Sequence, residues 1–162
     1  RKMPDIGIGT DVIAGFPGET EAMFAETMRV LEESPVSFFH VFPFSPRDGT
    51  PAAKYPDRPA PEVIRERAAR LRDLGRRKTR AFIGRFAGRT LEVLPEATVP
   101  GGGLRGYSRN YIPVEIEGEG ARENVPVMVR IESIIQGGPQ GEPQGGPQDA
   151  PQGGRVIGRV IG

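Results

Sequence analysis

Two short segments place small and flat residues where predicted strands end. The first is Gly15-Phe16-Pro17-Gly18-Glu19, and the second runs from Pro43 to Thr50 and contains Arg47. Glycines at a strand end let backbone amides and an aromatic face approach a ligand. A guanidinium such as that of Arg47 can hold a carboxylate or a phosphate through two parallel hydrogen bonds. The spacing therefore predicts a ligand site at the carboxyl ends of two strands.

Each of these residues also has a structural interpretation, which stays open. Gly-Phe-Pro-Gly can simply make the turn, Glu19 favours the start of a helix, and Arg47 can tie down its own turn. His40, the single histidine, alternates with Phe38 and Phe42, which favours a core or barrel-lining position over a catalytic base. We therefore assign no catalytic residue and no metal ligand.

The elements that must position these segments follow from periodicity. Residues 6–14 and 36–42 read as buried strands, and the helix from Thr20 to Glu33 lies between them. Strand, helix and strand with short connections form the unit of a parallel α/β sheet. A long helix follows at 61–83, and beyond Gly84 the apolar period changes from helical to alternating. This change predicts a small antiparallel β-barrel.

The composition divides the chain further. Residues 137–162 hold nine glycines and four prolines in tandem Pro-Gln repeats, followed by Arg-Val-Ile-Gly twice, so we expect a disordered tail. The expected organisation is an α/β part at 1–60, a basic linker helix at 61–83, a barrel at 84–136 and the tail at 137–162.

Several classes of function are excluded by residue content. With no cysteine and one histidine, the chain can supply neither a thiolate-held iron–sulfur cluster nor a disulfide. No apolar run approaches the length of a membrane span, and no leader opens the chain, so we expect a soluble, cytoplasmic protein that does not contact a membrane. The sequence opens at Arg1 and runs at once into strand-like residues, which indicates a piece of a longer protein.

Positive charge is concentrated in the linker helix. Residues 61–83 carry eight basic and three acidic side chains, in a chain whose net charge is +1. Such an excess is typical of a phosphate-binding surface, and we take Arg70, Arg76 and Arg77 as candidate RNA contacts. The alternative is a solvated helix face, since Glu62–Arg65 and Glu66–Arg70 have the spacing of ordinary ion pairs.

The two chemistry-bearing segments together resemble a known family. Thr-Asp-Val-Ile-Ala-Gly-Phe-Pro-Gly-Glu-Thr at 10–20 and His-Val-Phe-Pro-Phe-Ser-Pro-Arg-Asp-Gly-Thr-Pro-Ala-Ala at 40–53 are similar to the last barrel strands of radical S-adenosylmethionine methylthiotransferases. The second is nearest to the MtaB type, which acts on threonylcarbamoyl-adenosine beside the tRNA anticodon. In that family a helical connector and an RNA-binding TRAM β-barrel follow, as residues 61–136 do here.

The resemblance implies part of a cofactor site and part of an RNA site. In the cofactor site, Gly15 lets the adenine of S-adenosylmethionine approach the backbone, Phe16 packs on it, and Asp11 or Glu19 accepts a hydrogen bond. The partner is the anticodon stem-loop of tRNA, with Arg47 facing the reaction pocket. In the barrel, Tyr107, Arg109 and Tyr111 can stack on or contact unpaired bases, although both tyrosines can equally be core residues.

The resemblance also implies what this chain lacks. The family's iron–sulfur clusters are held by cysteines of the amino-terminal part, which we expect to be the partner of this carboxyl-terminal fragment. The fragment is then inactive alone, and its fold is the end of a partial parallel α/β barrel followed by the small barrel and the tail. Two alternatives remain: a stand-alone RNA-binding module, or a fragment of the isopentenyl-adenosine or ribosomal-protein branch.

Overall fold

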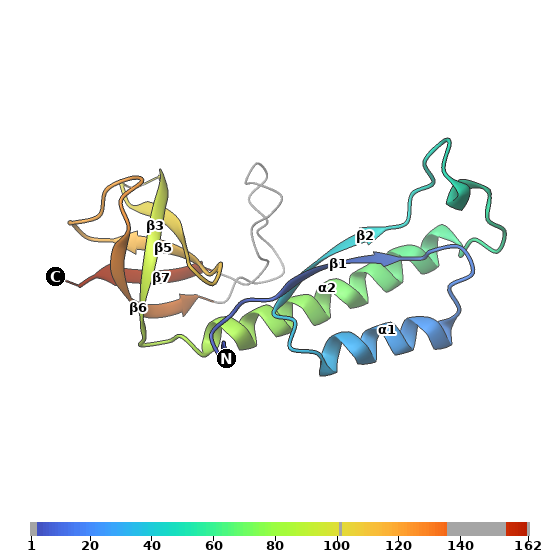
Figure 1. Ribbon diagram of the computed structural model, residues 1–162, viewed down its shortest axis with the longest axis horizontal. Coiled ribbons are helices and arrows are strands. Elements are labelled where there is room, and N and C mark those ends of the chain that lie inside the picture. The colour runs from blue at the N-terminus through green and yellow to red at the C-terminus, as the bar shows by residue number, and fades with distance from the viewer. Residues whose placement is uncertain (1–2, 101, 136–154, 162) are drawn as a thin grey trace. The chain divides into compact units, whose positions relative to one another are not determined.

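The computed structural model describes residues 3–100, 102–135 and 155–161 (Figure 1). The chain divides into two compact units: Ile8–Lys78, called the α/β unit, and Arg1–Gly7 with Thr79–Gly162, called the barrel unit. The division falls inside one helix rather than at the predicted positions 60 and 83. That helix places its apolar side chains in two separate cores, one on each side of the division.

The α/β unit holds the predicted strand–helix–strand motif. Strand β1 (Gly9–Ala14) lies parallel to β2 (Phe38–Pro43), with Asp11 opposite His40, and α1 (Glu21–Glu33) connects them. The Thr20 hydroxyl accepts a hydrogen bond from the Met23 amide at 3.2 Å, which makes Thr20 the predicted N-cap. A 3-10 helix (Pro51–Lys54) interrupts the connector, and α2 (Pro61–Gly84) follows.

The core of the α/β unit lies on one face of its two-stranded sheet. Both helices pack there, through Phe24, Leu31, Ala68, Leu71 and Leu74, with Val12, Ala14 and Val41 of the strands against them. Alternation along a strand sends the neighbouring side chains to the other face. On that face Ile13 and Phe42, which are register partners, are 53% and 51% exposed. The second face of the sheet therefore carries two apolar side chains beside Asp11 and His40, and it is uncovered by the described residues of this unit.

The barrel unit is a closed five-stranded barrel. Its strands are β3 (Thr90–Thr98), β4 (Leu104–Ser108), β5 (Pro113–Glu117), β6 (Val127–Ile135) and β7 (Arg155–Val160), in the closed order β3-β4-β5-β7-β6. Side chains from every strand fill the interior together with the end of α2, including Phe82, Phe86, Val93, Val114, Ile131 and Val156. Closure leaves no sheet edge unpaired.

Two expectations for this unit were wrong. The barrel is not wholly antiparallel, because β7 runs parallel to β5 while it pairs antiparallel with β6. The tail was expected to be disordered from 137 onward, yet residues 155–160 form the strand that closes the barrel, with Val156 and Ile157 buried. The low apolar content of the whole tail concealed a short run of β-branched side chains. Residues 137–154 lie outside the described part of the chain.

Neither α-helix in the described part of the chain combines the length and apolarity needed to cross a membrane. The described residues also contain no group of three or more His, Asp or Glu side chains placed to hold a metal ion.

Candidate functional site

The glycine turn, residues 15–19, follows β1 and is shaped by helix α2. Gly15 has φ +78°, a backbone conformation that L-residues rarely adopt, and a Cβ at this position would lie 2.5 Å from Cγ1 of Ile64. The chain on the other side is fixed as well, because the Phe44 amide donates to the Ala14 carbonyl at 2.8 Å. Glycine is therefore required at position 15 both by backbone angle and by the packing of α2.

Glu19 is engaged inside the protein through one oxygen of its carboxylate. Its Oε2 accepts from the Gly15 amide at 2.8 Å and from Nη1 of Arg67 at 2.8 Å, and Arg67 also donates to the Glu19 carbonyl at 2.9 Å. The two side chains are only 12% and 6% exposed. The structure thus shows a largely buried ion pair at Glu19, and hydrogen bonding of Glu19 to the cofactor stays a prediction.

Three aromatic rings gather beside the turn. Phe16 meets Phe44 edge-on, with ring centroids 5.3 Å apart, and meets Tyr55 at 6.1 Å. Phe16 is 39% exposed, so part of its ring can receive a flat ligand. The connector closes over the turn, because the Gly18 amide donates to the Asp57 carbonyl at 2.9 Å.

The remaining predicted residues of the α/β unit are exposed. Asp11 lies on the uncovered face of the sheet, next to His40 on β2. Arg47 is exposed in the loop after β2, and its carbonyl accepts from the Thr50 hydroxyl at 2.8 Å. That turn is held by its backbone and by Thr50, and the described hydrogen bonds include none from the Arg47 guanidinium. Its assignment to a ligand remains a prediction.

The three candidate arginines of α2 all have carboxylate neighbours. Arg70 lies 3.1 Å from Glu21, Arg77 lies 3.5 Å from Glu32, and Arg76 pairs with Asp73. These pairs are exposed and therefore weak, so a phosphate can compete for the guanidinium groups. The pairing accounts for the cluster as a solvated helix face, and RNA contact is not required to explain it.

Lys78, from the same basic segment, has a structural role. Its ammonium donates to the carbonyls of Glu32 and Ser34 at 3.0 and 2.8 Å, which caps the carboxyl end of α1. Partial burial lowers the pKa of Lys78 below its ordinary value. Helix-end carbonyls carry partial negative charge, so a cation is the favoured partner there.

In the barrel, the predicted residues lie on β4 and in the turn that follows it. Tyr111 has φ 62° and is 68% exposed, whereas Tyr107 is half-buried between its register partners Leu94 and Pro113. Arg109 is exposed and forms an ion pair with Glu92. Of the two tyrosines, Tyr111 therefore has the open ring that base stacking needs.

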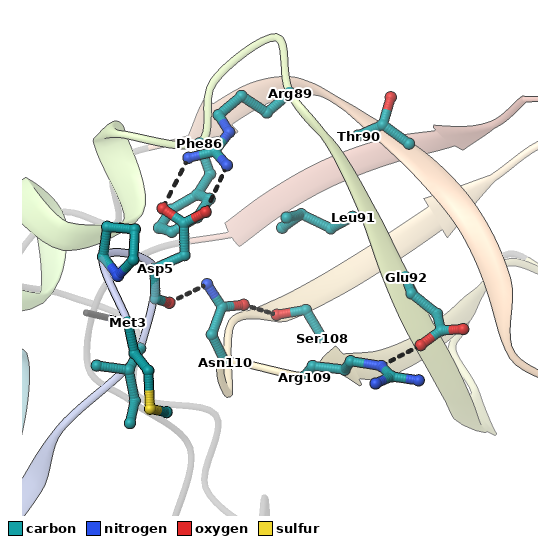
Figure 2. A pocket seen from close by; sticks show the side chains of 12 residues that line it. Met3, Asp5, Phe86, Arg89, Thr90, Leu91, Glu92, Ser108, Arg109 and Asn110 are labelled. Carbon is teal, nitrogen blue, oxygen red and sulfur yellow. Dashed lines mark hydrogen bonds and ion pairs between the residues drawn. The ribbon is translucent and has the colours of Figure 1, made fainter. Parts of the chain in front are cut away.

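A pocket of about 440 Å³ lies beside this turn, within the barrel unit (Figure 2). The Asp5 carboxylate accepts two hydrogen bonds from Arg89, at 3.0 and 2.6 Å, and the Asp5 backbone carbonyl accepts one from the side-chain amide of Asn110 at 3.0 Å. Asn110 in turn accepts from the Ser108 hydroxyl at 2.6 Å. The hydrogen bonds from Arg89 lower the pKa of the Asp5 carboxyl. The network fastens residues 3–6 to the barrel.

Sequence reasoning missed Arg67 and Asp5 because their partners are distant along the chain. Arg67 meets Glu19 across 48 positions and Asp5 meets Arg89 across 84. The one available signal was the placement of Arg67 among the apolar positions of the helix stripe, which indicated burial without naming a partner.

No protein-family model matches the chain. It is 38% identical over 114 residues to the threonylcarbamoyladenosine tRNA methylthiotransferase MtaB of Rickettsia prowazekii, and 34% identical over 143 residues to MtaB of Bacillus subtilis. These alignments cover 70% and 86% of this chain.

A second branch is also similar. The chain is 51% identical over 94 residues, 57% of its length, to the tRNA-2-methylthio-N(6)-dimethylallyladenosine synthase of Thermobifida fusca. The aligned parts make up 26%, 31% and 19% of these three relatives, so the chain spans at most about a third of their length. The family resemblance of the motifs is confirmed: the chain is a relative of the tRNA methylthiotransferases that matches part of their length.

Proposed function

We propose that this chain is the carboxyl-terminal part of a radical S-adenosylmethionine enzyme that adds a methylthio group to carbon 2 of threonylcarbamoyl-adenosine next to the tRNA anticodon. The observation that carries the proposal is its similarity to two MtaB proteins over 70% and 86% of the chain. On this proposal the α/β unit is the end of a partial parallel α/β barrel, and the barrel unit is a TRAM-like RNA-binding domain.

The residues at the end of β1 fit an adenosine-bearing cofactor in two respects. Gly15 is buried against Ile64 and makes the tight turn at the strand end, and the half-open ring of Phe16, the next residue, offers a flat face for the adenine. S-adenosylmethionine, when bound, supplies the methyl group and the source of the radical. Asp11, exposed on the open sheet face, is the more accessible of the two candidate carboxylates, because Oε2 of Glu19 already accepts from Gly15 and Arg67.

The chain's own residues do not fit a thiolate-held iron–sulfur cluster, because it contains no cysteine. The clusters belong, on this proposal, to an amino-terminal part of the enzyme that supplies the cysteines. This chain then binds and orients the cofactor and the RNA.

RNA contact is proposed for the exposed turn after β4 and for the basic side of α2. Tyr111 offers a ring for an unpaired base of the anticodon loop, and Arg109, Arg70, Arg76 and Arg77 offer guanidinium groups to phosphates. Each of these arginines must leave a weak surface ion pair to do so.

The decisive experiment identifies the product. The full-length protein encoded by the reading frame that contains this chain is reconstituted anaerobically with iron and sulfide. It is then supplied with tRNA bearing either threonylcarbamoyl- or dimethylallyl-adenosine. We expect a mass increase of one methylthio group on the threonylcarbamoyl nucleoside. Modification of the dimethylallyl nucleoside alone would contradict the proposal and assign the protein to the second branch. The 51% identity over 94 residues to a member of that branch is the observation in favour of this alternative.

RNA binding is tested on the chain itself, with an anticodon stem-loop titrated at several salt concentrations. Replacing Arg70, Arg76 and Arg77 together by Gln should reduce the magnitude of the log–log salt slope by about two to three units, since each phosphate contact contributes roughly 0.7 to 0.9. Replacing Tyr111 by Leu should cost about 1–3 kcal/mol with the slope unchanged. Arg29→Gln on α1, where Arg29 pairs with Glu26 and Glu33, is the matched control. Wild-type affinity and slope in the triple variant would leave the α2 arginines as a solvated face.

A further inference from the structure

Arg67 stands apart from the other arginines of α2. It is 5% exposed, whereas the side chains of Arg70 and Arg77 are 44% and 60% exposed. Its guanidinium is directed at the start of α1, where it meets Glu19, the more exposed Glu21 at 3.2 Å, and the ring of Phe24 at 5.2 Å. Its Nε is buried without a hydrogen-bond partner in the described part of the chain.

This arrangement is poorly suited to a purely stabilising role. A buried ion pair gains little net stability because both charges lose their water, and the unpartnered Nε adds a further cost. The ion pair does fix the orientation of the groups that it contacts. The Glu19 carboxylate has one oxygen, Oε2, that accepts from both Arg67 and the Gly15 amide, so the guanidinium fixes the carboxylate and the carboxylate fixes the Gly15 peptide.

A second contact from the same face of α2 supports that function. Ile64, three positions before Arg67, packs against the Cα of Gly15 closely enough to exclude a Cβ. The helix therefore holds the strand end at two points, by van der Waals contact at Gly15 and by the Arg67–Glu19 pair. Gly15 is buried at this turn, and the next residue, Phe16, exposes part of its ring there.

We infer that Arg67 is a positioning residue of the cofactor turn: acting through Glu19, it sets the orientation of the Gly15 peptide and thereby of the adjoining Phe16, whose exposed ring is presented to an adenosine-bearing ligand. This inference rests on the proposed function for the ligand's identity. The positioning itself is a property of the chain and is measurable without any cofactor.

The test compares amide hydrogen exchange in the wild-type 162-residue chain and in Arg67→Met, Arg67→Lys and Glu19→Gln variants. In Arg67→Met we expect the Gly15 amide to exchange at least about tenfold faster, because its acceptor loses the group that orients it. The Phe44 amide, bonded to the Ala14 carbonyl, should keep its protection, which separates loss of orientation from general unfolding. Arg65→Met, an exposed position on the same helix paired with Glu62, is the control.

Two further variants keep the test decisive should Arg67→Met fail to fold. Arg67→Lys retains the charge and should restore part of the Gly15 protection. Glu19→Gln keeps an acceptor oxygen but loses the ion pair. The increase in Gly15 exchange in the Glu19→Gln, Arg67→Met double variant should therefore be smaller than the sum of the increases in the two single variants. Unchanged Gly15 exchange in all folded variants, or equal acceleration at Gly15 and Phe44, would overturn the inference.

Titration with S-adenosylhomocysteine separates this inference from the proposed function. Shifts of the Gly15 and Phe16 resonances in the wild type, reduced in Arg67→Met and retained in Arg65→Met, support both. If no ligand shift appears in any protein while Gly15 exchange still depends on Arg67, the cofactor assignment fails and the positioning role stands.

Discussion

The two units of this chain differ in whether the edges of their sheets are paired. In the barrel unit, every strand has a neighbour on both sides, and apolar side chains from all five strands meet inside. In the α/β unit, β1 and β2 each have one neighbour, and one face of the sheet exposes Ile13 and Phe42. An isolated pair of strands is marginal in water, so this unit depends on its two helices for stability. The comparison shows that the barrel pairs all its strand edges internally, whereas the two-stranded sheet of the α/β unit has free edges and an open face that further strands can cover.

The largest expected effect comes from opening the barrel. Removing residues 155–162 deletes β7, which exposes the edges of β5 and β6 and withdraws Val156 and Ile157 from the core. We expect the barrel unit to lose cooperative unfolding, as measured by residue-specific amide exchange, while the α/β unit keeps its protection. Arg155→Gln is the control: it changes a residue of β7, removes only the ion pair between Arg155 and Glu115 of β5 at the barrel surface, and should change little. A barrel that stays cooperative without β7 would show that closure is not the source of its stability.

A smaller effect is expected from crowding the barrel wall without opening it. A Cβ added at Gly106 on β4 would overlap the Leu94 carbonyl, which is backbone and cannot rotate away. Gly106→Ala should therefore cost about 1–3 kcal/mol or more in the free energy of unfolding, measured by denaturant titration. Gly84→Ala is the matched control, because a Cβ there meets nothing within 4 Å and alanine favours the helix. Equal stability of the two variants would contradict the close strand approach.

A pH-dependent effect tests whether residues 3–6 belong energetically to the barrel. Hydrogen bonds from Arg89 lower the pKa of the Asp5 carboxyl, so the folded state binds a proton there less readily than the unfolded chain. The stabilisation is then fully present above the ordinary pKa of about 3.9 and is lost as pH falls through the lowered value. In Asp5→Asn the midpoint of barrel unfolding should fall at pH 7 and match the wild type at low pH. An equal shift of α/β unfolding would show that the segment is not specific to the barrel.

The smallest effect is expected on the uncovered sheet face. Phe42→Ser and Ile13→Ser remove apolar side chains that are already about half exposed, so unfolding of the α/β unit should change by about 0.5 kcal/mol or less. Phe24→Ala, in the core between the helices, should cost about 3–5 kcal/mol in the same denaturation experiment. A large loss in the two serine variants would mean that this face is covered in solution.

Much of the fold could be predicted from local sequence patterns. The helix predicted from Thr20 to Glu33 spans Glu21–Glu33 with Thr20 as its cap, and the helix predicted at 61–83 spans Pro61–Gly84. Both predictions rest on apolar spacing and capping residues, which act within a few positions. The two strands of the α/β unit were found in the same way, with ends displaced by at most three residues.

The missed features all depend on partners far apart in the sequence. Residues 155–160 become a strand only because β5 and β6 leave a gap between them, which no local pattern reveals. Gly15 and Phe16 directly follow the end of β1, as the sequence indicated, but the pairing of Glu19 with Arg67, 48 positions away, could not be predicted. A carboxylate next to a glycine turn has the same local pattern whether it faces a ligand or an internal arginine.

The position of β7 at the end of the chain also predicts the order in which the barrel strands fold. Strands β3 to β6 follow one another through short connections, but β7 pairs with them only after the chain has passed through residues 136–154. The β5–β7 pairs, such as Glu115 and Ile157, are 42 positions apart (157 minus 115), the largest separation among the described strand pairs of the barrel, and chain entropy makes such distant contacts slow to form. We expect β7 to dock last and to leave first during unfolding. The transient intermediate then carries an open seam between β5 and β6, where a strand from another chain can insert and start aggregation.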